Sequence, residues 1–538
     1  MSSEISLPAT MPIFSTQTPS RRLSIALGLV GVGLLALWLP VHATLPLGRD
    51  QAIIARVAQA LLEGKWPYVD AWDHKGPATY LLYAPLLRLF GSGEHALYWA
   101  DIALLGLVFM ACHSIGTSIG RHWMGGLGTL AALLFVRNDY WTFGQPDLWV
   151  GYLMLGATSL LVRPIAGRSS ATFGVVGAVI GIATMVKPIF GVLLALPLAT
   201  AWIDRESRAM RPSIAACLAG FGAMIGVVTL PFVAAGHGSD LFEALVTFNL
   251  GGHLTQTWDE PSAVALRFLL LLAMPGAELG SLPLLLIAGL GARELWRTHR
   301  RVATILGAAW LLSLLAALLQ GKAFPYHFAP THVLSAVFAA SFVARTLTSL
   351  VEPLLGNTGR SRRRHAIAAG LLAAGLLVVS QPHRARMHDW WASTFGLVDP
   401  EFRELRFCQI DYCPPETRRL AAIIQAETPP GTPIFVWGFD SAVYLLADRP
   451  SASRFGFSYP LIGGSAAWRA RARAELMQDL EHRRPGLIII EDFDFIRLML
   501  RRSSRDHLIG FPELPRLLAD HYVLAHDLER FAVYRLRD

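Results

Sequence analysis

The stretch from Arg49 to Pro77 is the longest polar interval in the first third of a very apolar sequence, and it carries Asp50, Asp70, Asp73 and Lys75. A carboxylate can act as a general base toward a hydroxyl group, and a lysine can hold a phosphate as a compact point charge. The stretch follows directly on an apolar run long enough to span a bilayer. Its residue types therefore fit chemistry on an anionic, lipid-linked substrate at a membrane surface.

Each of these residues also has a purely structural interpretation. Asp50 could be the N-cap of the amphipathic helix that follows it, because aspartate is favoured at that position. Lys75 could simply pair with Asp73 in a solvated loop. The residues alone leave both interpretations open.

Isolated ionisable residues also stand at other turns between apolar runs. Lys187 interrupts IATMVKPIFG, Asp147 lies in GQPDLW, and Lys322 and His327 lie in QGKAFPYHF. Charged groups at membrane depth are costly and usually face a polar cavity, although a lysine can also extend to the membrane surface. Convergence of these turns on one cavity would explain all of them together.

The composition places these turns in a membrane protein. The 538 residues are 53% hydrophobic and only 16% charged, with a mean hydropathy of +0.43, whereas soluble domains have about 25% charged residues. The net charge is +8, but the basic residues cluster in short bends between apolar runs, which is the positive-inside pattern. We therefore expect a lipid bilayer as a partner and no nucleic acid.

The apolar runs predict about eleven membrane-spanning helices with the N-terminus in the cytoplasm. Residues 21–43 are interpreted as an uncleaved first span, and residues 51–64 and 78–91 as helices on the membrane surface. Spans are expected at 23–39, 96–119, 125–136, 148–162, 214–233 and 366–379, among others. The predicted parts are a disordered cytoplasmic N-terminus at 1–20, a transmembrane domain at 21–381 with outer loops at 43–94 and 236–280, and a soluble α/β domain at 382–538 outside the cytoplasm.

The α/β prediction rests on alternating strand and helix patterns near the C-terminus. TPIFVWGF (432–439) and PGLIIIED (485–492) have the pattern of buried strands, while 416–427 and 466–484 have that of amphipathic helices. Cys408 and Cys413 lie in CQIDYC, and both a small-loop disulfide and two free thiols fit this spacing.

The order of these pieces resembles the GT-C membrane glycosyltransferases. The bacterial branch related to protein mannosyltransferases and ArnT, which is glycosyltransferase family 39-like, is the most similar. The resemblance is carried by an aspartate just after the first span and by four segments: GKWPYVDAWDHKGPATYLLYAPLLRLFG (64–91), IATMVKPIFGVLLALPL (182–198), GKAFPYHFAPTHVLSA (321–336) and IFVWGFDSAVYLLADRPSASRF (434–455). It implies inverting transfer of a sugar from a polyprenyl-phosphate donor to a glycan, lipid or protein acceptor. The reaction would take place on the outer face of a bacterial cytoplasmic membrane.

The resemblance also assigns roles to individual residues. Asp50 would be the catalytic carboxylate, with Asp147 as a second functional acid, and Lys75 and Lys187 would bind the donor phosphate. The other residues expected in the substrate cavity are Asp70, Asp73, Lys322 and His327.

The sequence departs from the family pattern at two positions. Gln51 follows Asp50 where many members have a second acid, so no metal site is predicted and a divalent cation is the one cofactor left open. DHKGP replaces the commoner lysine-Pro-Pro, which leaves Lys75 in place but changes the bend of the loop, since glycine is less restricted than proline.

Two rival functions come from other classes. A transporter or flippase of a lipid-linked sugar would have charges deep in the spans and inverted repeats, and neither is evident here. A non-catalytic assembly factor would keep its complexes after loss of the Asp50 carboxylate, whereas an enzyme would lose turnover.

Overall fold

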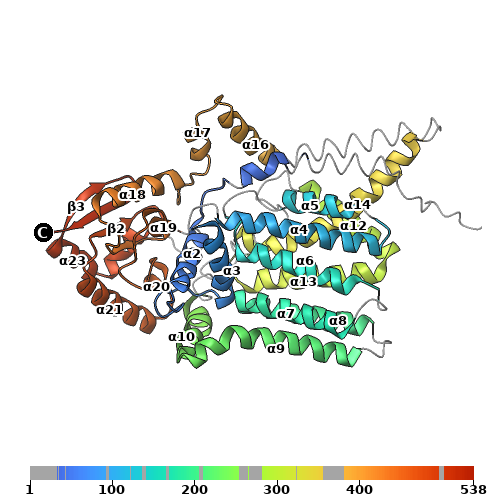
Figure 1. Cartoon of the computed structure of the whole chain (residues 1–538), viewed down its shortest axis with the longest axis horizontal. Helices are drawn as coiled ribbons and strands as arrows, with labels where there is room; N and C mark the ends of the chain where they lie inside the picture. Colours follow the sequence, from blue (N-terminus) through green and yellow to red (C-terminus); the bar gives the residue numbers. More distant parts are fainter. Residues whose placement is uncertain are drawn as a thin grey trace, which may run out of the picture.

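The protein, described here by a computed structural model, has two parts that meet along α2 (Arg49–Leu62) and α3 (Pro77–Phe90). One part is a bundle of long helices and the other is a smaller part with strands (Figure 1). The structure describes residues 33, 36–42, 44–91, 96–121, 123–135, 141–164, 169–204, 210–253, 265, 269, 282–322, 324–355, 381–495 and 502–537. The predicted segments 1–20 and 366–379, most of 23–39 and most of 254–280 lie outside these residues.

The bundle contains α4 (Ala96–Ser118), α5 (Met124–Phe135), α6 (Pro146–Val162), α7 (Ser170–Val186), α8 (Ala195–Ile203), α9 (Met210–Ala234), α12 (Leu282–Thr298), α13 (Arg300–Leu319) and α14 (Ala329–Leu355). Within the described ranges, four helices are long and apolar enough to cross a membrane, at 96–118, 211–234, 300–319 and 325–347. Shorter apolar helices coincide with the predicted spans at 125–136 and 148–162. The chain is therefore a multi-pass helical membrane protein.

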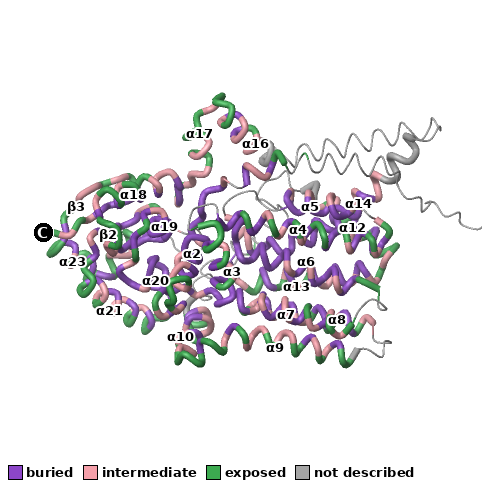
Figure 2. The backbone as a smooth tube through the Cα atoms, in the orientation of Figure 1, coloured by how far each residue is buried: buried purple, intermediate pink, exposed green. Residues whose placement is uncertain are grey.

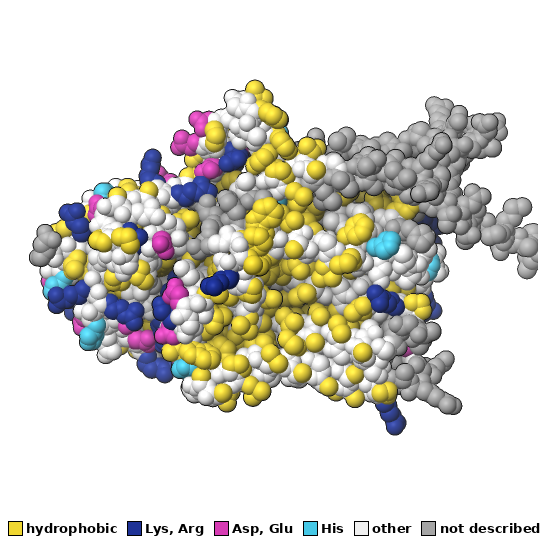
Figure 3. Space-filling model, in the orientation of Figure 1, with side chains coloured by type: hydrophobic (Ala, Val, Ile, Leu, Met, Phe, Trp, Pro, Cys, Tyr) yellow, Lys and Arg dark blue, Asp and Glu magenta, His cyan; other side chains and the backbone are white. Residues whose placement is uncertain are grey.

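The bundle has a protein-packed interior and an apolar outer surface. In the apolar window of α14, 89% of the residues are buried, against 17% in that of α9, so α14 is central and α9 is peripheral (Figure 2). Hydrophobic side chains cover the bundle on the face shown in Figure 3, whereas charged side chains gather on the strand-containing part. Helix α9 packs on α7 at backbone distance, because a Cβ at Gly177 would lie 1.9 Å from the carbonyl oxygen of Cys217.

Basic residues that the sequence places in bends on one side meet at one end of the bundle. Arg121 and Arg345 both pair with Glu294, at 2.6 and 2.7 Å. At the end of α6, Arg301 donates to the carbonyl oxygen of Val162 at 2.9 Å. Because α6 starts at Pro146, Asp147 in its first turn lies at the opposite end of the bundle.

The two helices predicted for the membrane surface form as α2 and α3. The apolar face of α2 is buried in protein: Ile54 and Val57 have no exposed surface, and the helix packs against α3 and α19 (Ala442–Ala447). Helix α2 therefore lies between the bundle and the strand-containing part.

The C-terminal part is built on a four-stranded sheet in the order β1-β2-β4-β3. Strands β1 (Ile434–Trp437) and β2 (Leu487–Glu491) are parallel, while β3 (Tyr522–Asp527) and β4 (Phe531–Leu536) are antiparallel to each other. Both predicted strands are confirmed, and every residue of β1 and β2 is buried. The predicted helices are confirmed as α18 (Pro414–Glu427) and α21 (Ala466–Arg483).

The remaining helices connect or cover these elements. Among them are α10 (Gly238–Phe242), α16 (Gln381–Thr394), α17 (Pro400–Leu405), α20 (Tyr459–Ile462), α22 (Ser504–His507) and α23 (Glu513–His521), with a short 3₁₀ helix η8 (Pro325–Phe328) before α14. Helices α16 and α17 form an arm that projects from the junction of the two parts (Figure 1).

Candidate active site

Asp50 lies in the first turn of α2, where the bundle meets the C-terminal part. The N-cap of this helix is Gly48, and no side chain caps it, so the interpretation of Asp50 as the N-cap is wrong. The Asp50 side chain is 27% exposed. It accepts a hydrogen bond from the Gln145 amide at 3.3 Å and lies 3.9 Å from the Lys75 ammonium group.

Lys75 lies between two carboxylates. Its Nζ is 3.9 Å from Asp50 and 3.5 Å from Asp73, and its side chain is only 9% exposed. The Tyr68 and Tyr80 hydroxyls both donate to the Lys75 carbonyl oxygen, at 2.7 and 3.1 Å. The pairing with Asp73 is thus confirmed, but it occurs in a buried site rather than in a solvated loop.

Asp73 fixes the loop from its buried position. Its Oδ1 accepts from the backbone N–H of His74 at 2.8 Å and lies 3.2 Å from the ring Nδ1 of the same residue, while its Oδ2 faces Lys75. A carboxylate with these partners orients the lysine, and Asp50 is the more exposed of the two acids.

Gly76 explains one of the two departures from the family pattern. Its N–H donates to the Val186 carbonyl oxygen at 2.9 Å, and a Cβ at this position would lie 2.0 Å from the Met185 carbonyl oxygen. Proline could not donate this hydrogen bond. Glycine therefore lets the Lys75 loop approach the C-terminal end of α7, next to Lys187.

We expect Gly76→Ala to lower the thermal stability of the protein. The new methyl group would collide with backbone atoms that cannot turn away, and overpacking of this kind costs about 1–3 kcal/mol. Thermal unfolding of the protein in lipid nanodiscs measures this change. Gly106→Ala is the control because nothing lies within 4 Å of a Cβ there; an equal loss in both variants would contradict the argument.

Lys187 and Asp147 form a second ion pair beside the first. The Lys187 ammonium lies 2.6 Å from the Asp147 carboxylate, 3.2 Å from the Gln320 amide oxygen and 5.3 Å from the centre of the Tyr326 ring. Asp147 is fully buried and Lys187 is 17% exposed. Lys187 thus faces a buried acid rather than extending to the membrane surface.

Lys322 and His327 complete the group from the turn before α14. Both are buried, and the His327 Nδ1 lies 2.6 Å from the Lys322 carbonyl oxygen. The Lys322 ammonium lies 5.8 Å from the centre of the Tyr459 ring in the C-terminal part. This turn therefore contacts both parts of the molecule.

The charges of this cluster influence one another. Burial alone would raise the pKa of Asp50, but Lys75, a hydrogen bond from Tyr326 and Lys187 hold the pKa below its ordinary value. The pKa of Asp73 is held well below its ordinary value, again against burial and mainly by Lys75. Burial would lower the pKa of Lys75, but Asp73 and Asp50 raise it above its ordinary value. Both acids and Lys75 are therefore charged near neutral pH.

The pKa of Lys322 is shifted in the opposite direction from that of Lys75. Burial and the nearby positive charge of Lys187 hold its pKa well below the ordinary value, with Asp50 acting in the opposite direction. An additional negative charge in the site, such as a phosphate, would favour its protonated form.

Seven of the eight site residues predicted from the sequence lie in this cluster. Several supporting groups were not predicted. Asp70 is exposed and accepts from the Trp66 backbone N–H at 2.7 Å, away from the other residues. Gln145 was missed, although it lies two residues before Asp147. Asp101 was also missed: it accepts from the Trp149 indole at 2.6 Å and the Gly144 N–H at 2.7 Å, and so holds the turn that carries Gln145.

The cluster does not have the donor set of a protein-held metal ion. Among the residues that the structure describes, no three His, Cys, Asp or Glu side chains gather as ligands. Gln51, which stands where many family members have an acid, donates to the Phe143 carbonyl oxygen at 2.7 Å and ties α2 to the turn before α6. A groove of about 290 Å³ lies elsewhere, between α23 and the sheet.

Fold and site together define a multi-pass membrane protein whose ion pairs gather at one end of the bundle, beneath a C-terminal α/β part. No protein-family model and no curated protein matches the sequence. Among solved structures, the chain is similar to ArnT from Cupriavidus metallidurans bound to undecaprenyl phosphate. The TM-score is 0.58 and the identity 13%, over 95% of this chain and 97% of that chain. A looser likeness, with a TM-score of 0.47 and 11% identity over 86% of this chain and 69% of the other, is to the oligosaccharyltransferase AglB from Archaeoglobus fulgidus. The chain therefore has the GT-C fold, which it shares with ArnT.

Proposed function

We propose that the protein transfers a sugar, with inversion, from a polyprenyl-phosphate donor to an acceptor hydroxyl or amine at the outer face of a bacterial cytoplasmic membrane. The observation that carries the proposal is the pairing of the partly exposed Asp50 carboxylate with the buried Lys75 ammonium at 3.9 Å. The fold is also that of ArnT, whose structure contains undecaprenyl phosphate.

Asp50 is the proposed general base. It is the most exposed of the three aspartates in the cluster, since Asp73 and Asp147 have no exposed side-chain surface. Its carboxylate would take the proton from the acceptor as the acceptor attacks the anomeric carbon. The bond from that carbon to the phosphate oxygen breaks in the same step, and the polyprenyl phosphate leaves with the bonding electrons.

Lys75 and Lys187 are the proposed donor-phosphate ligands. Negative charge grows on the phosphate as it leaves, and fixed positive charges in a site shielded from water stabilise that charge. Asp73 and Asp147 hold the two ammonium groups in place before the donor arrives. No step of this mechanism needs a metal ion.

The charges of the site predict different pH dependences for the free enzyme and for the donor complex. In the free site, Lys75 is a main cause of the low pKa of Asp50. A bound phosphate would share Lys75 and add negative charge, so the pKa of Asp50 should rise in the complex. The kcat/KM profile reports the free enzyme and kcat the complex.

We therefore expect kcat/KM to stay level down to about pH 5, since ordinary aspartate has a pKa of about 3.9, while kcat begins to fall at a higher pH. Initial rates measured from pH 4.5 to 8 at low and saturating donor check this. An acid limb of kcat at or below that of kcat/KM would contradict the proposed role of Lys75.

The test of the function is a panel of radiolabelled polyprenyl-phosphate sugars, offered to the purified full-length protein in lipid nanodiscs. Transfer to an acceptor, or slow release of sugar from one donor, would support the enzyme and name the sugar. In vesicles, movement of an intact donor across the bilayer with no cleavage of any donor would instead support a transporter.

A further inference from the structure

The residues just before Asp50 are held by a short loop from far along the chain. Tyr412 donates its hydroxyl to the Leu47 carbonyl oxygen at 2.6 Å, and its ring centre lies 5.3 Å from the Arg49 guanidinium carbon. The neighbouring Asp411 carboxylate lies 3.7 Å from the same guanidinium group. Both residues belong to CQIDYC, so this loop contacts the start of α2 at two points.

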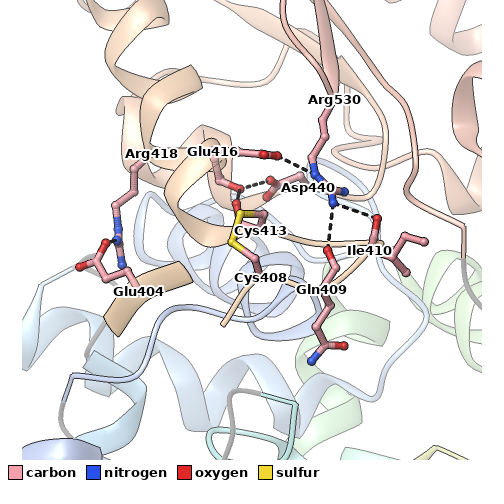
Figure 4. Close-up of a disulfide and its surroundings, with 10 residues drawn as sticks. Glu404, Cys408, Gln409, Ile410, Cys413, Glu416, Arg418, Asp440 and Arg530 are labelled. Atoms are coloured by element: carbon pink, nitrogen blue, oxygen red, sulfur yellow. Dashed lines mark hydrogen bonds and ion pairs between the residues drawn. A yellow bond between two sulfur atoms is a disulfide. The ribbon is translucent and has the colours of Figure 1, made fainter. Parts of the chain in front are cut away.

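The loop is itself held in shape. Cys408 and Cys413 form a disulfide, which resolves the choice that the sequence left open. Arg530 donates to the carbonyl oxygens of Gln409 and Ile410, each at 2.9 Å, so that the loop is tied to the turn between β3 and β4 as well (Figure 4). The disulfide and the arginine together present the loop as a rigid unit.

A third contact to Arg49 comes from the sheet. Glu491, the last residue of β2, lies 3.5 Å from the Arg49 guanidinium, and the side chains are 5% and 2% exposed. The other oxygen of Glu491 accepts from the backbone N–H groups of Phe439 and Asp440, at 2.6 and 2.9 Å. The Glu491 carboxylate is therefore fixed in direction toward Arg49.

The same part of the chain also holds the connection between α2 and α3, just before Asp73 and Lys75. Arg454 donates to the Tyr68 carbonyl oxygen at 2.7 Å, and the Trp72 N–H donates to the Arg454 carbonyl oxygen at 2.9 Å. The backbone just before Asp50 and the backbone before Lys75 are thus both tied to the C-terminal part.

We propose that the disulfide loop 408–413 and Glu491 form a clamp on Arg49 that positions Asp50 for catalysis. Arg49 is the positioning residue: it touches no reacting atom and acts through Asp50, which follows it in the first turn of α2. The proposal rests on the proposed function, because it assigns the clamp a role in that reaction. A misplacement of a reacting group by about 1 Å can cost a factor of about 10² in rate.

The clamp contacts the residue next to Asp50 but not Lys75. Loss of the clamp should therefore lower kcat more than it weakens the binding of the donor phosphate. In Arg49→Gln and in Cys408→Ser/Cys413→Ser, we expect kcat to fall by about 10- to 100-fold. The dissociation constant of undecaprenyl phosphate should stay within about twofold of wild type, because Lys75 and Lys187 remain in place. Arg49→Lys should recover part of the loss. Arg49→Gln/Glu491→Gln should lose no more than Arg49→Gln alone, because Arg49→Gln already removes the Arg49–Glu491 contact and a glutamine oxygen can still accept from the Phe439 and Asp440 N–H groups.

Hydrogen exchange of residues 48–62 gives a readout that needs no activity. Exchange at the start of α2 should be faster in both clamp variants than in wild type. Arg473→Gln is the control: this arginine of α21 donates to the Leu461 and Gly510 carbonyl oxygens and has no bond to α2. It should change neither kcat nor exchange in α2.

The outcomes separate the two proposals. Unchanged kcat and unchanged exchange in the clamp variants would overturn the clamp, as would equal losses in kcat and phosphate binding, which indicate a general structural defect. Multiplied losses in the Arg49/Glu491 double variant would overturn it as well. If wild type turns over no donor, the proposed function fails, and unchanged or faster exchange at the start of α2 then decides whether the clamp exists.

Discussion

Asp50→Asn should reduce sugar transfer by about a thousandfold or more and leave the binding of polyprenyl phosphate nearly unchanged. General bases contribute about 10²–10⁴ in rate, and asparagine keeps the shape of the side chain while losing its basicity. The amide can still meet Gln145, so the first turn of α2 should remain folded. Single-turnover transfer and the equilibrium binding of undecaprenyl phosphate, measured on the same nanodisc samples, separate chemistry from binding.

Glu63→Gln is the matched control for this variant. Glu63 lies at the end of the same helix, is 47% exposed and pairs with the exposed Lys65 at 2.7 Å. It should transfer sugar at the wild-type rate. Residual activity of Asp50→Asn within tenfold of wild type would exclude Asp50 as the base and direct attention to another acid in the cluster.

Lys75→Met should weaken donor binding and lower kcat together, with a combined loss in kcat/KM of about 10³-fold. Removal of one preorganised donor to a developing charge costs about 10²–10³ in rate, and the lysine also binds the ground-state phosphate. The methionine additionally leaves Asp73 buried without its closest ammonium group, which lies at 3.5 Å in the wild type. We therefore expect the pKa values of Asp50 and Asp73 to rise in this variant.

Lys65→Met tests whether the loss in Lys75→Met reflects position rather than total charge. Lys65 is 52% exposed and lies on the same connection between α2 and α3. If both lysine variants bind undecaprenyl phosphate as tightly as wild type, Lys75 does not hold the phosphate. Lys75→Arg should recover little activity, because the planar guanidinium does not reproduce a compact ammonium group between two carboxylates.

Most of the fold could be predicted from hydrophobic patterns. Apolar length alone located helices such as α4 and α13, and short apolar runs between Pro and Gly located β1 and β2. These signals are strong because a buried backbone in lipid or in a sheet interior needs continuous apolar side chains. The two C-terminal strands at 522–527 and 531–536 were missed. The first is mostly exposed, and the second begins with three buried residues and ends in more exposed ones, so neither forms a continuous apolar run.

The sequence could predict which residues of one loop belong to the candidate site, but not which loops lie together. Asp50 and Lys75 share one polar stretch, so residue types and resemblance singled them out together. The pair between Asp147 and Lys187 joins residues from different helices, and no sequence pattern states that the two turns meet. Arg49 stands next to Asp50 in the sequence. Only the packing of the C-terminal part shows that its side chain is buried and pairs with Glu491.

The long reach of the contacts to Arg49 has a consequence for the biosynthesis of the protein. The hydrogen-bonded partners Arg49 and Glu491 are 442 residues apart. Synthesis at about 5–20 residues per second separates their appearance by roughly 20 to 90 s. During that interval α2 has reached the membrane while the residues that hold its first turn do not yet exist. A nascent chain therefore contains the charged residues of the bundle cluster long before it contains the residues that hold Arg49. The arrangement around Asp50 is complete only after the last strands of the sheet have been synthesised.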